Sequence, residues 1–66
     1  MHTGLLMDIN QAVNDYHRGI LTKAGLASQF RSIYSRIRNT EMEHFEEDEL
    51  VYNIDLFVHE IGLENV

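Results

Sequence analysis

The sequence predicts an all-α fold, a small antiparallel bundle of three helices with room for one extra short turn. Apolar residues recur at steps of three and four in three separate blocks, which is the spacing that places them on one face of a helix. The 66 residues contain no proline and only four glycines, so only short segments separate the blocks. Because no linker or low-complexity stretch divides the chain, we expect a single helical domain over residues 1–66.

The first block predicts an amphipathic helix near the N-terminus. Its apolar stripe consists of Leu6, Ile9, Val13 and Tyr16, widened by Leu5 and Ala12. Thr3 is a candidate N-cap, since a threonine hydroxyl can accept a hydrogen bond from a free N–H of the first turn. We expect the helix to end near Gly19, because glycine readily adopts the left-handed conformation that closes many helices.

The second block predicts a helix from about Lys23 to Arg38. Its stripe consists of Leu26, Phe30, Ile33 and Ile37, flanked by Tyr34. Thr22 is the candidate N-cap, and Asn39 can close the helix in place of glycine. We expect the apolar residues Ile20 and Leu21 to pack the preceding turn onto the core.

The third block has the widest apolar face, so we expect it to be the most buried helix. Its apolar residues are Leu50, Val51, Ile54, Phe57, Val58 and Ile61, and Gly62 follows them. Thr40 and Glu43 have the spacing of a capping box. However, Phe45 lies about 180° from Ile54 on a helical projection, so either the helix breaks near Phe45 or Phe45 is exposed. We favour a short helical turn over residues 41–45 and a main helix from about Glu46.

The charges are divided unevenly along the chain. With 11 Asp and Glu residues against 5 Lys and Arg, the formal net charge is −6. Residues 1–40 hold all five basic residues and two acidic ones, whereas residues 41–66 hold nine acidic residues and no Lys or Arg. Exposed ion pairs of the third helix with Arg31 and Arg38 would contribute little. Because a compact anionic surface attracts cations, we expect a basic protein partner.

The candidate partner-binding surface lies on the third helix. It consists of Glu46, Glu47, Asp48, Glu49, Tyr52 and Asp55. Tyr52 points about 160° away from Ile54, and an exposed tyrosine among carboxylates is typical of a protein interface. Glu47 points nearer the core than the other carboxylates. The alternative is that the acidic run is a solvated face whose first residues complement the helix dipole.

The sequence offers no site for catalysis, for a cofactor or for a metal ion. It contains no cysteine, which excludes disulfides, thiolate-bound zinc and thiol nucleophiles. None of its four histidines has a second histidine three or four residues away, as a helical zinc site would need. A chain this short also has little room for a pocket that raises the pKa of a general acid. We therefore expect that the protein is not an enzyme.

Composition also limits the compartment and the class of partner. No apolar run approaches the about 20 residues that a membrane helix needs, and the N-terminus has no basic leader region. The negative net charge disfavours binding to nucleic acid and to anionic lipid, since both need clustered Lys and Arg. We therefore expect a cytoplasmic protein whose partner is neither nucleic acid nor a membrane.

Several short motifs of this chain occur together in a known family. The motifs are Tyr16-His17-Arg18-Gly19-Ile20-Leu21-Thr22, then Phe30 and Tyr34, an acidic segment, and Asp55-Leu56-Phe57. Over roughly residues 16–60 the chain resembles the small helical bacterial immunity proteins of the colicin D type. The resemblance implies a protein that binds the cationic nuclease domain of a toxin, with carboxylates in place of substrate phosphates. It would bring Glu46, Glu47, Asp48 and Glu49 to Lys and Arg of the toxin, with Tyr52 and Asp55 beside them.

Two functions follow from these observations. The first is a small acidic binding protein that neutralises a cationic partner, as an immunity protein or inhibitor blocks a nuclease toxin. The second is a homodimeric helical protein with a structural or regulatory adaptor role and no toxin partner. Such a dimer would share Leu50, Ile54 and Phe57 across a two-fold axis. The two differ in salt response, because contacts between charges are screened by salt and apolar contacts are not.

Overall fold

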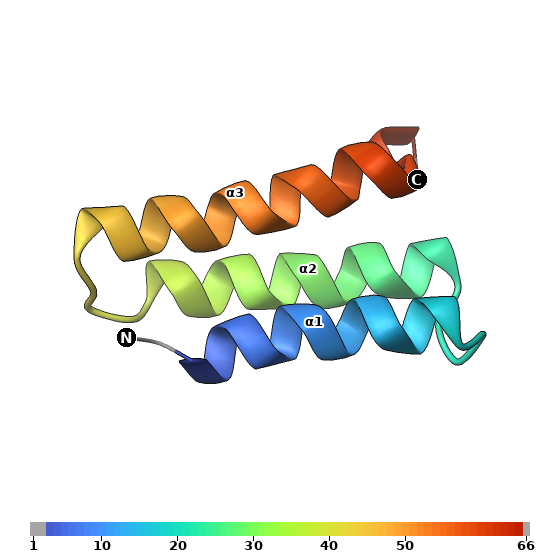
Figure 1. Cartoon of the computed structure of the whole chain (residues 1–66), viewed down its shortest axis with the longest axis horizontal. Helices are drawn as coiled ribbons and strands as arrows, with labels where there is room; N and C mark the ends of the chain where they lie inside the picture. Colours follow the sequence, from blue (N-terminus) through green and yellow to red (C-terminus); the bar gives the residue numbers. More distant parts are fainter. Residues whose placement is uncertain (1–2, 66) are drawn as a thin grey trace.

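The computed structural model describes residues 3–65 and shows an all-α bundle of three antiparallel helices (Figure 1). In chain order the elements are α1 (Thr3–His17), α2 (Lys23–Arg38), α3 (His44–Ile61) and a final 3-10 turn, η1 (Leu63–Asn65). The bundle measures 33 × 20 × 17 Å along its principal axes, and α2 lies between α1 and α3 in the view of Figure 1. The predicted fold class is confirmed.

All four elements contribute to one apolar core. Its buried residues are Leu5, Ile9, Ala12 and Val13 of α1, Leu26, Phe30, Ile33 and Ile37 of α2, Leu50 and Ile54 of α3, and Leu63 of η1. Ile9, Leu26 and Ile54 are completely buried, and burying an apolar side chain of this size contributes about 1.5–3 kcal/mol. The stripes predicted for the first two helices are therefore the faces that pack together. The contribution of Leu63 was not expected from the sequence.

The structure describes α1 from Thr3 onward, and the N-cap role predicted for the Thr3 side chain lies outside the described residues. At the other end, Gly19 has a φ of 79°, as predicted for a residue that closes a helix. The N–H groups of Gly19 and Ile20 donate to the carbonyl oxygens of Tyr16 (3.1 Å) and Asp15 (2.8 Å). This pair of hydrogen bonds is the Schellman motif, which satisfies carbonyls that the helix leaves free.

The bounds of α2 are those predicted. Thr22 is its N-cap, and the Thr22 hydroxyl oxygen accepts a hydrogen bond from the Gly25 N–H at 3.1 Å. Asn39 ends the helix with a φ of −92°, so it closes α2 without adopting the left-handed conformation. In the turn before α2, Leu21 packs against the core as expected. Ile20 does not, since it is 60% exposed.

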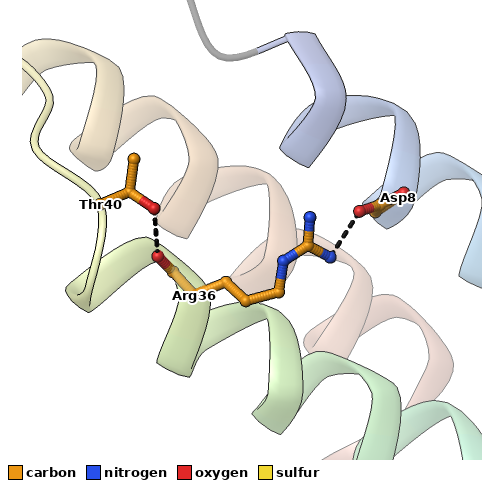
Figure 2. A network of polar contacts seen from close by, with 3 residues as sticks. All are labelled: Asp8, Arg36 and Thr40. Atoms are coloured by element: carbon orange, nitrogen blue, oxygen red, sulfur yellow. Dashed lines mark hydrogen bonds and ion pairs between the residues drawn. The ribbon is translucent and has the colours of Figure 1, made fainter.

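The start of α3 lacks the capping box predicted for it. The helix begins at His44, and its N-cap is Glu43, which makes no side-chain capping hydrogen bond. The Thr40 hydroxyl instead donates to the Arg36 carbonyl oxygen at 2.6 Å, as Figure 2 shows. Thr40 therefore satisfies the last turn of α2 rather than the first turn of α3.

The path of α3 corrects a second prediction. We favoured a short turn over residues 41–45 and a main helix from about Glu46, so that Phe45 and Ile54 need not share one straight helix. The structure shows the other alternative, an unbroken helix in which Ile54 is completely buried and Phe45 is 67% exposed. The error lay in treating an apolar side chain as one that must be buried, although folded proteins expose much apolar surface.

The expectation that the third helix is the most buried is also wrong. Only Leu50 and Ile54 of α3 are buried, whereas α2 buries five residues. The remaining apolar residues of the wide face, Val51, Phe57, Val58 and Ile61, are partly exposed. The reason is that α3 packs less closely against α1 and α2 than these two helices pack against each other. The predicted end of α3 is correct, since Gly62 closes it with a φ of 81°.

Candidate functional site

The six predicted site residues all lie on α3, and four of them are exposed. The exposed four are Asp48, Glu49, Tyr52 and Asp55, whereas Glu46 and Glu47 are partly buried. Tyr52 is 64% exposed, in agreement with its predicted outward direction. We refer to the exposed four as the acidic surface, because they form the part of the predicted site that a partner meets directly.

The two partly buried carboxylates have a sufficient explanation within the helix. Glu46 and Glu47 lie in the first turn of α3, where a negative charge near the free N–H groups contributes about 0.3–1 kcal/mol. This effect falls off beyond the first turn. It therefore accounts for these two carboxylates but not for the carboxylates of the acidic surface.

Within the described part of the chain, no Lys or Arg forms an ion pair with the acidic surface. Arg31 and Arg38 of α2 form no ion pair with the carboxylates of α3 in this part of the chain. The ion pair that α2 does form joins Arg36 Nη1 to Asp8 Oδ2 of α1 at 2.5 Å (Figure 2). This pair binds α2 to α1, on the side away from α3. The carboxylates of Asp48 and Glu49 are consequently available to cations from solution or from a partner.

Asp55 has a structural role that the sequence did not indicate. Its Oδ1 accepts a hydrogen bond of 2.5 Å from the Tyr34 hydroxyl of α2. Desolvation by burial, this hydrogen bond and the negative charge of Asp55 together raise the pKa of Tyr34 to about 12. The bond joins α3 to α2, so Asp55 stabilises the bundle independently of any contact with a partner.

Sequence reasoning left two exposed residues out of the candidate site. Phe45 is 67% exposed and Leu56 is 36% exposed. The projection that placed Tyr52 also places these two residues opposite Ile54, at about 180° and about 200°. The signal was thus present in the sequence, but Phe45 was assigned to a short turn before the main helix and Leu56 was given no role.

A hollow at the start of α3 does not involve the acidic surface. It measures about 560 Å³, is open to solvent, and is lined by Glu41, Met42, Glu43 and Glu46. Among residues 3–65, no three His, Asp or Glu side chains lie close enough together to hold a metal ion. An exposed helix with charged and aromatic side chains is suited to contact with another macromolecule.

Comparison with protein-family models, with curated proteins and with solved structures finds no match to this chain. None of the helices in residues 3–65 has the length and apolar character that a membrane-spanning helix requires.

Proposed function

We propose that this chain is an acidic binding protein that neutralises a cationic protein partner, and that the partner is a nuclease toxin which the chain blocks as an immunity protein. The chain acts by binding and not by catalysis, in the bacterial cytoplasm. The observation that supports the proposal is the exposure of Asp48, Glu49 and Tyr52 on a helix that contains no Lys or Arg. The resemblance to colicin D immunity proteins supports the same class of partner.

The charge of the acidic surface matches what a nuclease presents. A protein that binds the phosphate backbone carries clustered Lys and Arg at its substrate site. Carboxylates on a rigid helix have the sign of charge of phosphates, so they compete with substrate for those cations. The exposed ring of Tyr52 adds a large contact area at a small cost in side-chain entropy.

The homodimeric adaptor is the second candidate, and the packing of α3 weighs against the interface expected for it. Leu50 and Ile54, which were expected to be shared across a two-fold axis, are 6% and 0% exposed inside the monomer. Phe57 alone of the three retains exposed surface. A dimer through α3 would also bring the carboxylates of two copies together, and like charges across an interface are unfavourable.

Sedimentation equilibrium of the pure protein distinguishes the two candidates without a known partner. We expect a monomer at low and at high salt, about 0.05 M and about 0.5 M, because the core residues are already satisfied within one chain. A dimer of equal stability at both salt concentrations would instead show an apolar interface between copies. That result would place the adaptor function first.

The inhibitor function itself is tested with a purified nuclease domain of the colicin D type. We expect the protein to bind this domain, to stop its cleavage of nucleic acid at equimolar concentration, and to bind less tightly as salt increases. The double variant Asp48→Lys/Glu49→Lys should lose about tenfold or more in affinity. Full cleavage in the presence of excess wild-type protein would contradict the assignment to this type of toxin.

A matched control variant distinguishes the loss of contacts made by Asp48 and Glu49 from an effect of the protein's net charge on affinity. The variant Glu41→Lys/Glu64→Lys changes the net charge by the same amount but alters the segment before α3 and the turn η1. Within the described part of the chain, the ion pair that it removes is the long, exposed contact of 3.6 Å between His59 Nδ1 and Glu64 Oε1. We expect it to retain most of the affinity, and an equal loss in both variants would show that only net charge matters.

A further inference from the structure

The outward side of α3 carries a row of large apolar side chains. Phe45, Tyr52 and Leu56 are 67%, 64% and 36% exposed. On a helical projection they lie at about 180°, about 160° and about 200° from the buried Ile54, so they form one narrow row along the helix. We refer to these three residues as the outer ridge. Single exposed apolar residues are ordinary, whereas a contiguous exposed row with one direction is typical of an interaction surface.

Carboxylates border the outer ridge on both sides. By the same projection, Asp48 and Asp55 lie at about 120° and about 100°, between the ridge and α2. On the opposite side, Glu49 and Glu60 lie at about 220° and about 240°. All four are exposed, and α3 contains no Lys or Arg. A partner that covers the ridge must therefore place positive charge along both edges of its own apolar surface.

The spacing of the ridge specifies the shape of that partner. Phe45 and Tyr52 are seven residues apart and Leu56 follows four residues later, which are the intervals of the apolar positions in a coiled coil. In this pattern position 49 falls between Phe45 and Tyr52. It is a glutamate, so the partner would place a lysine opposite it. Charged residues flanking such a row determine which helices pair with it.

We propose that the outer ridge of α3 is a docking surface for a basic amphipathic helix of the partner, with an apolar stripe against Phe45, Tyr52 and Leu56 and Lys or Arg on both flanks. This rests on the proposed function and adds to it the secondary structure that is recognised. A second copy of α3 does not fit, because its flanks would place carboxylate against carboxylate, and like charges in paired helices are destabilising.

The test uses two synthetic peptides of about three heptads with the same composition of Leu and Lys. In the first, Leu occupies the a and d positions and Lys the flanking e and g positions. In the second, the same residues are shuffled so that no apolar stripe forms. Binding of each labelled peptide to the whole protein is measured by fluorescence anisotropy at low salt. We expect the amphipathic peptide to bind at least about tenfold more tightly than the shuffled one.

Two variants of the protein separate the ridge from other exposed apolar surface. Phe45→Ser/Tyr52→Ser/Leu56→Ser removes the ridge, and Met7→Ser/Ile20→Ser removes two side chains that are 68% and 60% exposed elsewhere. We expect the ridge variant to bind the amphipathic peptide at least about tenfold less tightly and the control to bind it as the wild type does. If circular dichroism shows that the triple variant is unfolded, the single variant Phe45→Ser replaces it, with a smaller loss expected.

The outcomes distinguish this inference from the function on which it rests. Equal binding of both peptides, unchanged by the ridge variant but lost in Asp48→Lys/Glu49→Lys, would overturn ridge docking and leave recognition of a basic partner standing. Binding of neither peptide by the wild type would count against both. Tight binding of the amphipathic peptide that the ridge variant loses and the Met7→Ser/Ile20→Ser control keeps supports the inference.

Discussion

A hydrogen bond between side chains joins α3 to α2. The Tyr34 hydroxyl donates to Asp55 Oδ1 at 2.5 Å, and the pKa of Tyr34 is raised to about 12, mainly by burial. The bond joins residues 21 positions apart in sequence. Neither residue carries a local sequence signal for this contact, so the pairing follows only from the packing of the two helices.

We expect Tyr34→Phe to lower the free energy of unfolding by about 1 kcal/mol at pH 7, because a hydrogen bond to an exposed carboxylate is lost while the ring remains. Urea unfolding monitored by circular dichroism measures this difference. An unchanged midpoint would show that water replaces the bond without cost.

The same substitution isolates the pH dependence of this contact. In the unfolded chain the tyrosine loses its proton near pH 10, whereas the folded state keeps it until about pH 12. Between these values the folded state binds more protons than the unfolded state, so stability falls as pH rises. We expect the stability advantage of wild type over Tyr34→Phe to be constant below pH 10 and to shrink between pH 10 and 12. A constant difference across this range would contradict the raised pKa.

At the scale of the helices, local chemistry determined what was predictable. The bounds of α2 and the glycine ends of α1 and α3 follow from Thr22, Gly19 and Gly62, whose roles depend only on neighbouring backbone. The start of α3 does not follow from such a local signal, because the Thr40 hydroxyl donates its hydrogen bond to the Arg36 carbonyl oxygen of the preceding helix. The 3-10 turn η1 depends on Leu63 reaching the core, which requires the tertiary structure.

The outward direction of the candidate site was predictable for a related reason. Helical periodicity fixes the direction of Tyr52 once Ile54 is placed in the core, and the structure agrees. The burial of Glu46 and the bond of Asp55 to Tyr34 could not be predicted, because both depend on which neighbours the faces of α3 meet. Periodicity gives the angle of a residue on its own helix but not the neighbour it meets.

The two threonines that precede the second and third helices should respond differently to truncation. Thr22→Ala removes the hydrogen bond from the Gly25 N–H, and loss of an N-cap costs about 1 kcal/mol. Thr40→Ala removes only an exposed bond to the Arg36 carbonyl oxygen, which water can replace, so we expect a loss of a few tenths of a kcal/mol. Chemical denaturation of both variants measures the difference. A larger loss for Thr40→Ala would indicate that it caps α3 after all.

Substitution of the glycine that closes α1 tests how much its left-handed conformation contributes to stability. Gly19 has a φ of 79°, and a Cβ in the left-handed region costs about 1–2 kcal/mol. We expect Gly19→Ala to lower stability by about 1 kcal/mol, as measured by thermal unfolding. The control is Gly4→Ala, which lies in the first turn of α1 with open space around the added Cβ. This control should raise stability by up to about 1 kcal/mol.

At the scale of the whole molecule, the bundle separates its charges. All Lys and Arg residues lie in α2 or in the segment between α1 and α2, whereas nine of the 11 acidic residues lie in residues 41–66. Ion pairs offset little of this negative charge within the described part of the chain. The repulsion among these carboxylates opposes folding, so the arrangement costs stability in the free protein. A cationic partner would relieve that cost on binding.

This repulsion predicts that salt stabilises the free protein. Raising the NaCl concentration from about 0.02 M to about 0.5 M shortens the Debye length from about 20 Å to about 4 Å. Like-charge pairs one turn apart on a helix cost about 0.2–0.5 kcal/mol each. Glu43 with Glu47, and Glu46 with Glu49, have this spacing. We therefore expect the free energy of unfolding to rise by about 0.5–1 kcal/mol, as measured by urea denaturation at the two salt concentrations.

The variant Asp48→Lys/Glu49→Lys provides the comparison for this effect. It breaks the run of four carboxylates at residues 46–49 and places a cation one turn from Glu46, so screening removes less repulsion and the rise should be smaller. An equal rise in the variant would indicate a general effect of salt on apolar burial. A fall in wild-type stability would show that screening of the helix dipole and of the Arg36–Asp8 pair outweighs the repulsion. In that case the carboxylates of the acidic surface do not destabilise the free protein, and binding of a cationic partner would relieve no repulsion.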